Sequence, residues 1–441
     1  MRVLDALQFW VLPSVEAFRD AWDELRFEVE TSLGRPISTG PLQHPVHMAG
    51  YGRLSTARLQ RLITDQREHI LRDDLHRDIV ALPDGDPRRM AWLSVCPIAT
   101  AFTTTRPTWT EELGDDDFSD HLTMYLGAEA PALRAYTGRR IPCSHPAYQP
   151  DGRECDPHGH QLGLASLPNA DFTPCHEGCA AALFDMVGSI TRVDREPIHA
   201  FHAVVPPDML HPGPFGNRPG IITDGAAYLS MTAAVTARGA RQPRRPEDPR
   251  WLHFDVKTIH AGGPNYTSAR ARHDQTGAVA DRAHQVQPQY ERHARILDRR
   301  IADTQGTPLG TAVFDHLRSL TQVRALVVGN YAEASADVHQ LVSIVAGELA
   351  QRRWRRMGAR SQAEARGFFI ASLRRSLCVV FAREMARHRL RRIPFIGVPR
   401  EAIRARPPYR VQHEPQYLPQ MAQLADFMRL QAHVPPVMAA A

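Results

Sequence analysis

Two apolar runs, each carrying an aspartate, most constrain the fold of this chain. Asp224 lies in the run at 221–235, Asp255 lies in the run at 251–260, and a loop rich in proline and arginine joins the runs at 238–250. Short apolar runs bounded by turn residues are typical of buried strands. Helical patterns precede and follow them, so we predict an α/β core in which these two strands lie side by side.

The second run also contains Lys257, which is the only lysine among the 441 residues. Arginine is a planar fork that stays protonated, whereas the lysine ammonium is a compact point charge whose pKa can shift. Lys257 follows Asp255 by two positions, and side chains alternate along a strand, so we expect both on one face. A single lysine placed beside a carboxylate indicates a catalytic role for that lysine. The alternative is a chance survivor in an arginine-biased composition.

These three side chains suit the hydrolysis of a phosphodiester. Asp224 and Asp255, converging from neighbouring strands, can hold a divalent metal ion through oxygen ligands, and we expect Mg²⁺ or Mn²⁺. Such an ion polarises the phosphodiester and lowers the pKa of bound water. The ammonium of Lys257 would orient that water or stabilise charge in the transition state.

The chain is longer than one ordinary core allows, so we predict several domains. Residues 1–135 are mostly helical in pattern, residues 136–174 form a connector rich in cysteine and histidine, residues 175–395 mix helix and strand, and residues 396–441 form a proline-rich tail. The 43% hydrophobic and 23% charged residues indicate a soluble globular protein. No apolar run approaches the roughly 18 residues of a membrane span and no signal-peptide pattern is present, so we expect an intracellular protein.

Positive charge is concentrated near the C-terminus. Residues 352–400 contain 14 arginines and two acidic residues, a local net charge of +12, against +5 for the whole chain. This concentration favours a polyanionic partner, most simply nucleic acid, whereas the alternative is a solvated helix face. The arginines that we expect to bind nucleic acid are Arg352, Arg353, Arg355, Arg356, Arg374, Arg375, Arg387 and Arg391.

The connector and the residues just after it hold a candidate zinc site. Cys143, Cys155, His160 and Cys175 could gather around a tetrahedral Zn²⁺ ion. The alternative, which we favour, is that these thiols carry no metal and pack in a turn-rich linker.

The residues around both aspartates resemble the PD-(D/E)xK nuclease signature, in which a short hairpin carries both acids. Thr223-Asp224 stands in place of Pro-Asp, and Asp255-Val256-Lys257 matches the D-x-K part fully. The resemblance implies a restriction-endonuclease-like core of four to five mixed strands flanked by helices, which a helical N-terminal domain would precede.

Over roughly residues 90–395, the chain resembles the C-terminal region of eukaryotic non-LTR retrotransposon polyproteins that carry a restriction-like endonuclease. The segment Cys175-His176-Glu177 resembles the start of the first nuclease helix there, and the segment 282–290 resembles the helix after the second catalytic strand. This adds His176 as a contact to phosphate, Glu177 as a third metal ligand and Tyr290 as a residue lining the DNA cleft. Each has a structural alternative: a structural histidine, a capping glutamate and a packed tyrosine.

The chain also departs from these polyproteins. The segment 156–160 resembles part of their Cys/His finger, but the chain has no Cys-x-x-Cys pair there and has Ala165 where a cysteine is expected. No Tyr-x-Asp-Asp motif of a reverse transcriptase is present. In the resembled elements the nuclease nicks target DNA to prime reverse transcription. The resemblance therefore implies DNA as the partner, RNA and a separate reverse transcriptase module as further partners, and a nuclear location.

Two other functions stay open from the sequence. In the first, the nuclease centre no longer works, and the chain is a nucleic-acid-binding protein derived from such an element. In the second, Lys257 forms a Schiff base with a carbonyl substrate. Asp255 argues against the second, because a neighbouring carboxylate holds the amine protonated.

Overall fold

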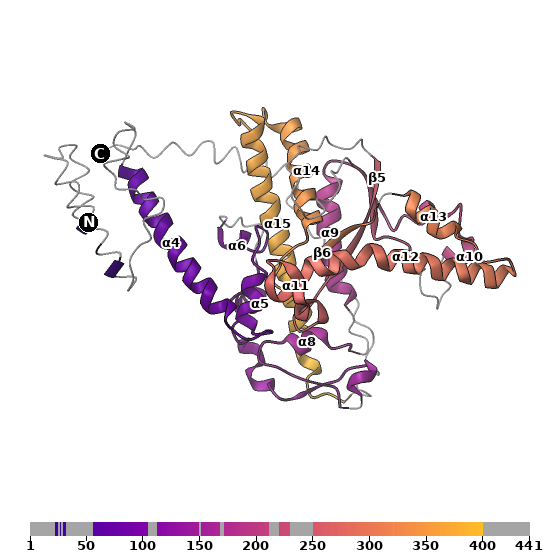
Figure 1. Cartoon of the computed structure of the whole chain (residues 1–441), viewed down its shortest axis with the longest axis horizontal. Coiled ribbons are helices and arrows are strands. Elements are labelled where there is room, and N and C mark those ends of the chain that lie inside the picture. The colour runs from indigo at the N-terminus through magenta and orange to yellow at the C-terminus, as the bar shows by residue number, and fades with distance from the viewer. Residues whose placement is uncertain are drawn as a thin grey trace. The chain divides into compact units, whose positions relative to one another are not determined.

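The computed structural model describes residues 56–104, 113–149, 151–167, 172–210, 220–229, 250–320 and 322–399, with a few isolated positions between 23 and 31. Most of the predicted helical region before residue 56, much of the 238–250 loop and the tail from residue 400 lie outside this part. Figure 1 shows the arrangement of the elements. None of the helices in the described part is long and apolar enough to cross a membrane.

The chain divides into two compact units, Met1–Leu82 and Pro83–Ala441. Helix α4 (Thr56–Val80) belongs to the first unit, and the sheet and all later helices belong to the second. The predicted boundary at residue 135 therefore does not separate compact units. Residues before 135 belong to the second unit because helix α7 (Asp115–Tyr125) packs against the C-terminal helix α15 (Gln362–Leu390). Asp117 of α7 also forms an ion pair with Arg387 of α15 at 3.1 Å.

A four-stranded mixed sheet forms the centre of the second unit. Its strand order is β3 (Val193–Arg195), β4 (Gly225–Leu229), β5 (Arg250–Thr258) and β6 (Arg324–Val328). The first three strands pair antiparallel, and β5 pairs parallel to β6, with Lys257 opposite Val327. The predicted α/β class is thus confirmed. The strand expected at 221–235 begins only at Gly225.

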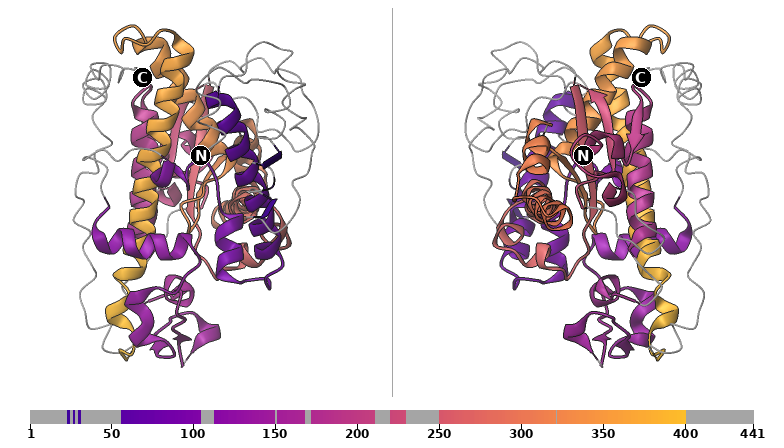
Figure 2. Two further views of the ribbon diagram at one scale, coloured as in Figure 1. Left: turned by 90° about the vertical axis from the view of Figure 1, so that its left-hand side faces the viewer. Right: turned by 90° about the vertical axis from the view of Figure 1, so that its right-hand side faces the viewer.

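Strand β5 separates two hydrophobic layers because its side chains alternate between the two faces. Leu252, Phe254 and Val256 join the core formed with helices α9 (Thr173–Gly188), α14 (Ala336–Arg353) and α15. The opposite face of the sheet lies against helix α12 (Gly277–Gln305), where a second core gathers around Val286 and Val327. Figure 2 shows α15 and α12 on opposite sides of the strands.

Gly225, the first residue of β4, lies where the strand meets helix α9. A Cβ atom at this position would lie 2.7 Å from the ring of Phe184. Only glycine lets β4 approach α9 so closely, and this approach sets the position of Asp224, the residue before it.

In two segments the local sequence pattern allows more than one structure. The apolar segment 198–205, which Pro197 and Pro206 flank as they would a short strand, forms a 3₁₀ turn at Ile198–Phe201. The pattern over 362–392, which would also allow two shorter helices, forms one helix, α15, which packs against α7, α9 and α14 and continues for 29 residues.

The connector has a small core of its own. A two-stranded pair, β1 (Arg140–Ile141) and β2 (Arg153–Glu154), precedes the short helix α8 (His160–Leu164). Leu133, Ile141, Cys155 and Leu162 pack there together with Ile396, which the sequence had placed in the tail. Burial of these apolar side chains thus contributes to the compactness of this segment.

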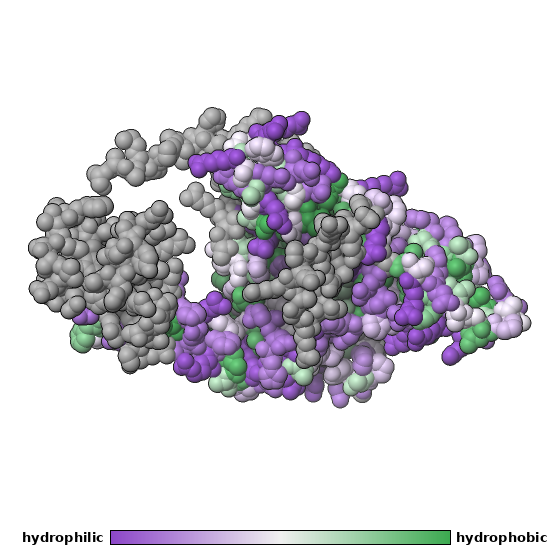
Figure 3. Space-filling model, turned by 45° about the horizontal axis from the view of Figure 1, so that its top comes forward, coloured by the Kyte–Doolittle hydropathy of each residue, from purple (hydrophilic) through white to green (hydrophobic). Residues whose placement is uncertain are grey.

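The remaining helices are short and pack around these layers. On the face in Figure 3, hydrophilic side chains predominate and hydrophobic ones lie in scattered patches. The remaining α-helices are α5 (Pro87–Leu93), α6 (Ala101–Thr104), α10 (Pro207–Leu210), α11 (Ala269–His273) and α13 (Ala312–Ser319).

Candidate active site

Asp224 is fixed at the point where strand β4 begins. Its Oδ2 accepts a hydrogen bond from the backbone N–H of Val256 at 2.7 Å, and its backbone carbonyl accepts one from the N–H of Glu196 at 3.1 Å. The side chain thus reaches across to β5, while the backbone of the residue is held from the side of β3. Its exposed fraction is 27%, so the carboxylate remains accessible to solvent.

Asp255 and Lys257 lie on the same face of β5, as the sequence predicted. The Nζ of Lys257 donates to Oδ1 of Asp255 at 2.7 Å. From helix α12, the hydroxyl of Tyr290 donates to the same oxygen, also at 2.7 Å. The Asp255 side chain is 2% exposed and that of Lys257 is 25% exposed. The carboxylate is therefore buried, and the ammonium extends from it toward solvent.

The second carboxylate oxygen of Asp255 has no such support. Among the described residues, its Oδ2 is buried and has no hydrogen-bond partner. An unpaired buried carboxylate oxygen is costly, at roughly 1–3 kcal/mol, unless a ligand outside the chain meets it. Oxygen ligands from carboxylates are those that Mg²⁺ and Mn²⁺ prefer, so the residues present fit such an ion.

The two carboxylates have opposite pKa shifts. Burial raises the pKa of Asp255, while the charge of Lys257 opposes this rise and the charge of Asp224 adds to it. Burial also acts to raise the pKa of Asp224, but the hydrogen bond from His176 and the charge of Lys257 outweigh it, so the pKa falls. Asp224 is thus held as a carboxylate. Burial and the charge of Asp255 raise the pKa of Tyr290 well above its usual range, which keeps it a hydrogen-bond donor.

His176 closes the site from helix α9. Its Nε2 lies 3.1 Å from the carbonyl oxygen of Val256 and 3.4 Å from Oδ2 of Asp224, and its Nδ1 lies 3.5 Å from Oε1 of Glu177. Burial lowers the pKa of His176, but hydrogen bonds to Asp224 and Glu177 outweigh it and raise the pKa to about 10. The imidazolium therefore links the first turn of α9 to both strands of the site.

Glu177 lies at the rim of the site. Its side chain is 45% exposed, and the hydrogen bond with His176 lowers its pKa. Within the described ranges, no group of three carboxylate, imidazole or thiol ligand atoms that lie within 4.8 Å of one another includes Glu177 and the two aspartates. Its predicted role as a third metal ligand stays a prediction.

Among the residues that the structure describes, the predicted zinc ligands Cys143, Cys155, His160 and Cys175 form no group whose ligand atoms lie within 4.8 Å of one another. Cys143 and Cys155 are buried, and Cys155 packs among Leu133, Ile141 and Leu162 in the connector core. Burial raises the pKa of the Cys155 thiol to about 11, and the charge of Asp156 adds to this rise. These cysteines serve as small apolar residues, the alternative that the sequence favoured.

The predicted nucleic-acid-binding arginines divide into exposed and engaged groups. Arg375 is 4% exposed, which contradicts its predicted role because a buried guanidinium cannot reach a phosphate. Arg387 pairs with Asp117. Arg353, Arg374 and Arg391 are partly exposed, whereas Arg352, Arg355 and Arg356 are exposed where α14 ends.

Sequence reasoning missed two histidines, His260 and His388. In the structure they lie beside Cys175, and the ligand atoms of the three side chains lie within 4.8 Å of one another. Each histidine is isolated in the sequence, and the three positions span more than 200 residues, so no local spacing pattern connects them. No protein-family model, curated protein or solved structure matches this chain.

Proposed function

We propose that this protein is a metal-dependent DNA endonuclease with a restriction-like core. One observation carries the proposal: Asp224 comes directly before β4, and Asp255 lies on the neighbouring antiparallel strand β5. The chain's single lysine donates to one oxygen of Asp255, while the other oxygen has no partner among the described residues. The mixed four-stranded sheet between helical layers supports the finer fold assignment.

Asp224 and Asp255 would hold Mg²⁺ or Mn²⁺, which supplies charge stabilisation at the phosphate and a more acidic bound water. Lys257 is positioned by Asp255 with its ammonium partly in solvent, where it can meet a phosphate oxygen or the attacking water. His176 holds Asp224 in place, and as an imidazolium it adds positive charge beside the scissile phosphate.

The exposed arginines would hold DNA at a distance from the cleavage centre. Arg352 donates to the carbonyl of Ile190, just past the C-terminal end of α9, whereas His176 lies in the first turn of the same helix. A helix of 16 residues is about 24 Å long, which corresponds to roughly 7 base pairs of duplex. Contacts at both ends would thus place one duplex along α9.

The biological role follows the resemblance. We propose that the nick is made in target DNA, where it would serve to prime reverse transcription by a separate module in the nucleus. RNA is a further candidate partner, because phosphate contacts from arginine are common to both nucleic acids.

The experiment is a nicking assay on supercoiled plasmid, with Mg²⁺, Mn²⁺ or EDTA. We expect metal-dependent nicking by the parent chain and a loss of about 100-fold or more in Lys257→Arg and Asp224→Asn. The arginine variant keeps the charge, so it tests whether the compact ammonium is needed. Asp194→Asn, which alters an aspartate on the neighbouring strand β3, is the matched control and should nick like the parent.

Two outcomes would redirect the assignment. Equal nicking by the parent and Lys257→Arg would contradict the role of the lysine. No nicking by any variant, together with salt-sensitive DNA binding, would favour the nucleic-acid-binding protein without a working nuclease centre, for which the exposed arginines at the end of α14 suffice.

A further inference from the structure

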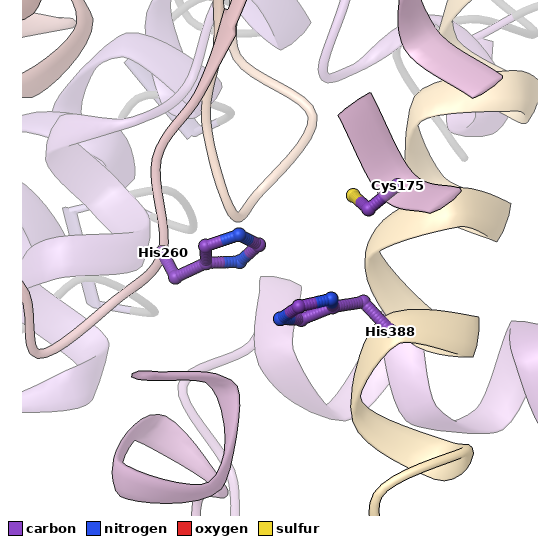
Figure 4. Close-up of side chains that lie close together, drawn as sticks. All are labelled: Cys175, His260 and His388. Atoms are coloured by element: carbon purple, nitrogen blue, oxygen red, sulfur yellow. The ribbon is translucent and has the colours of Figure 1, made fainter. Parts of the chain in front are cut away.

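Three side chains from distant parts of the sequence meet in a buried cluster. Cys175 lies in the first turn of α9, His260 lies two residues after β5, and His388 lies in the last turns of α15. Their ligand atoms all lie within 4.8 Å of one another, and the three side chains face one another in Figure 4. Their exposed fractions are 2%, 7% and 5%, so the cluster is closed to bulk solvent.

The cluster leaves polar atoms without partners. Neither ring nitrogen of His260 has a hydrogen-bond partner among the described residues. The rings of His260 and His388 stack with centroids 4.2 Å apart, and the ring of Phe172 lies 5.3 Å from that of His260. Stacking accounts for the faces of the rings but not for the nitrogens, which native proteins rarely leave unpaired when buried. A bound cation would satisfy one of the two, because a neutral imidazole offers a single lone pair to a metal.

Both imidazoles are in the form that binds metal. Burial lowers the pKa of His260 to about 3, and the charges of Arg392 and Arg389 add to the effect. Burial and the neighbouring His260 lower the pKa of His388 well below its usual range. Both shifts favour the neutral imidazole, which is the form that offers a lone pair to a cation.

The donor set selects the class of metal. No carboxylate belongs to the cluster, which excludes the oxygen-preferring ions Mg²⁺ and Ca²⁺. The thiolate of Cys175 would offset part of the charge of the cation. The thioether sulfur of Met385 lies 3.8 Å from Sγ of Cys175 and is a further soft donor near the cluster. One thiolate and two imidazoles suit Zn²⁺, and the same set with a distant thioether suits copper.

We propose that Cys175, His260 and His388 form a site for one Zn²⁺ or copper ion, which is separate from the nuclease centre. In tetrahedral sites these ligand atoms lie roughly 3.5 Å apart, so binding would draw the three side chains closer together. The ion would join α9, the end of β5 and α15. It would thereby fix the helix that carries His176 against the strand that carries Lys257.

The first test is the metal content of the purified full-length chain. We expect about one equivalent of zinc or copper in the parent, and visible absorption from a copper–thiolate bond distinguishes the two ions because Zn²⁺ is colourless. Cys175→Ser and His260→Gln should each lose the ion. Cys378→Ser and His121→Gln are matched controls, because they alter a buried cysteine and a buried histidine with unpaired ring nitrogens outside the cluster, and they should keep it.

A second measurement separates loss of metal from loss of folding. The metal-free chain is unfolded by heat with and without added Zn²⁺ and, separately, Cu²⁺. Because a ligand of the folded state raises Tm, we expect a rise of several degrees in the parent and both controls, and none in Cys175→Ser or His260→Gln. Co²⁺ loaded into the parent should show thiolate charge-transfer absorption that Cys175→Ser lacks.

The proposal is overturned if the parent binds neither ion and its Tm does not respond to either. It is also overturned if the cluster variants retain metal as the parent does. Neither result depends on nicking, so the nuclease proposal stands or falls separately.

Discussion

The hydroxyl of Tyr290 donates to Oδ1 of Asp255 at 2.7 Å, and this bond joins helix α12 to strand β5. The tyrosine is 4% exposed, so the bond is protected from water. Because Lys257 donates to the same oxygen, the carboxylate cannot rotate freely, and its unpaired Oδ2 is held in one direction. Tyr290 is thus a positioning residue for the carboxylate.

Tyr290→Phe tests this role. Loss of the hydrogen bond should cost about 1.5–3 kcal/mol, because the acceptor is charged, and should reduce the nicking rate by roughly 10-fold or more. The rates are compared at saturating Mg²⁺ and at limiting Mg²⁺. A positioning role predicts a higher metal requirement in the variant, which a purely structural role would not produce.

Tyr331→Phe is the matched control for that variant. Tyr331 is 1% exposed, and its hydroxyl has no hydrogen-bond partner in the described part of the chain. Removing this hydroxyl should leave nicking unchanged and should not lower the free energy of unfolding. Equal losses in the two variants would show that Tyr290 acts only through packing.

Gly225→Ala should disturb the site through the backbone. The added Cβ would meet the ring of Phe184 at 2.7 Å, and strand pairing with Phe254 prevents β4 from moving away. We expect a loss of about 1–3 kcal/mol in the free energy of unfolding, measured with urea, and reduced nicking because Asp224 is displaced. Gly188→Ala, at the end of α9, is the control, because a Cβ there meets nothing within 4 Å. A stable Gly225→Ala variant with full activity would contradict the close approach.

The exposed arginines at the end of α14 should contribute to DNA affinity without base specificity. Arg355→Ala combined with Arg356→Ala is expected to weaken binding and to reduce the slope of log Kd against log salt by about 2. The measurement is fluorescence anisotropy of duplex DNA over a salt series. Arg299→Ala combined with Arg300→Ala removes the same charge from exposed positions on α12. An equal effect in both pairs would assign the binding to net charge and not to this surface.

Local patterns predicted part of this structure. The period of two along β5 was enough to place Asp255 and Lys257 on one face. Local sequence patterns could not predict that a whole helix is buried. Arg375 is buried because α7, α9 and α14 cover α15. The amino-acid composition of such a helix does not show which of its arginines face solvent.

The clustering of Cys175 with His260 and His388 was equally inaccessible to the sequence. It depends on three elements that pack together, α9, the end of β5 and α15, and each contributes a single ligand. The predicted zinc set, by contrast, followed the local density of cysteine and histidine in the connector, where apolar packing buries the thiols. Spacing motifs identify sites within one segment, and this cluster spans three.

The buried histidine His121 should contribute to the pH dependence of stability. Burial, and then the charge of Arg389, lower the pKa of His121 to about 3, against about 6.5 in the unfolded chain. The stability from this group is therefore fully present above pH 6.5. Below that value the unfolded chain takes up a proton that the folded chain does not, and the free energy of unfolding falls by about 1.4 kcal/mol per pH unit.

His121→Phe should remove this contribution. The new ring would pack against Phe102 and Tyr125, whose rings lie 5.3 and 6.4 Å from that of His121. Between pH 7 and pH 5, we expect the loss of unfolding free energy, measured with urea, to be about 2 kcal/mol smaller in the variant than in the parent. His273→Gln, at an exposed position, is the control and should follow the parent. The same loss in His121→Phe and in the parent would show that His121 takes up its proton as readily in the folded chain as in the unfolded chain, because a histidine couples folding to pH only when its pKa differs between the two states.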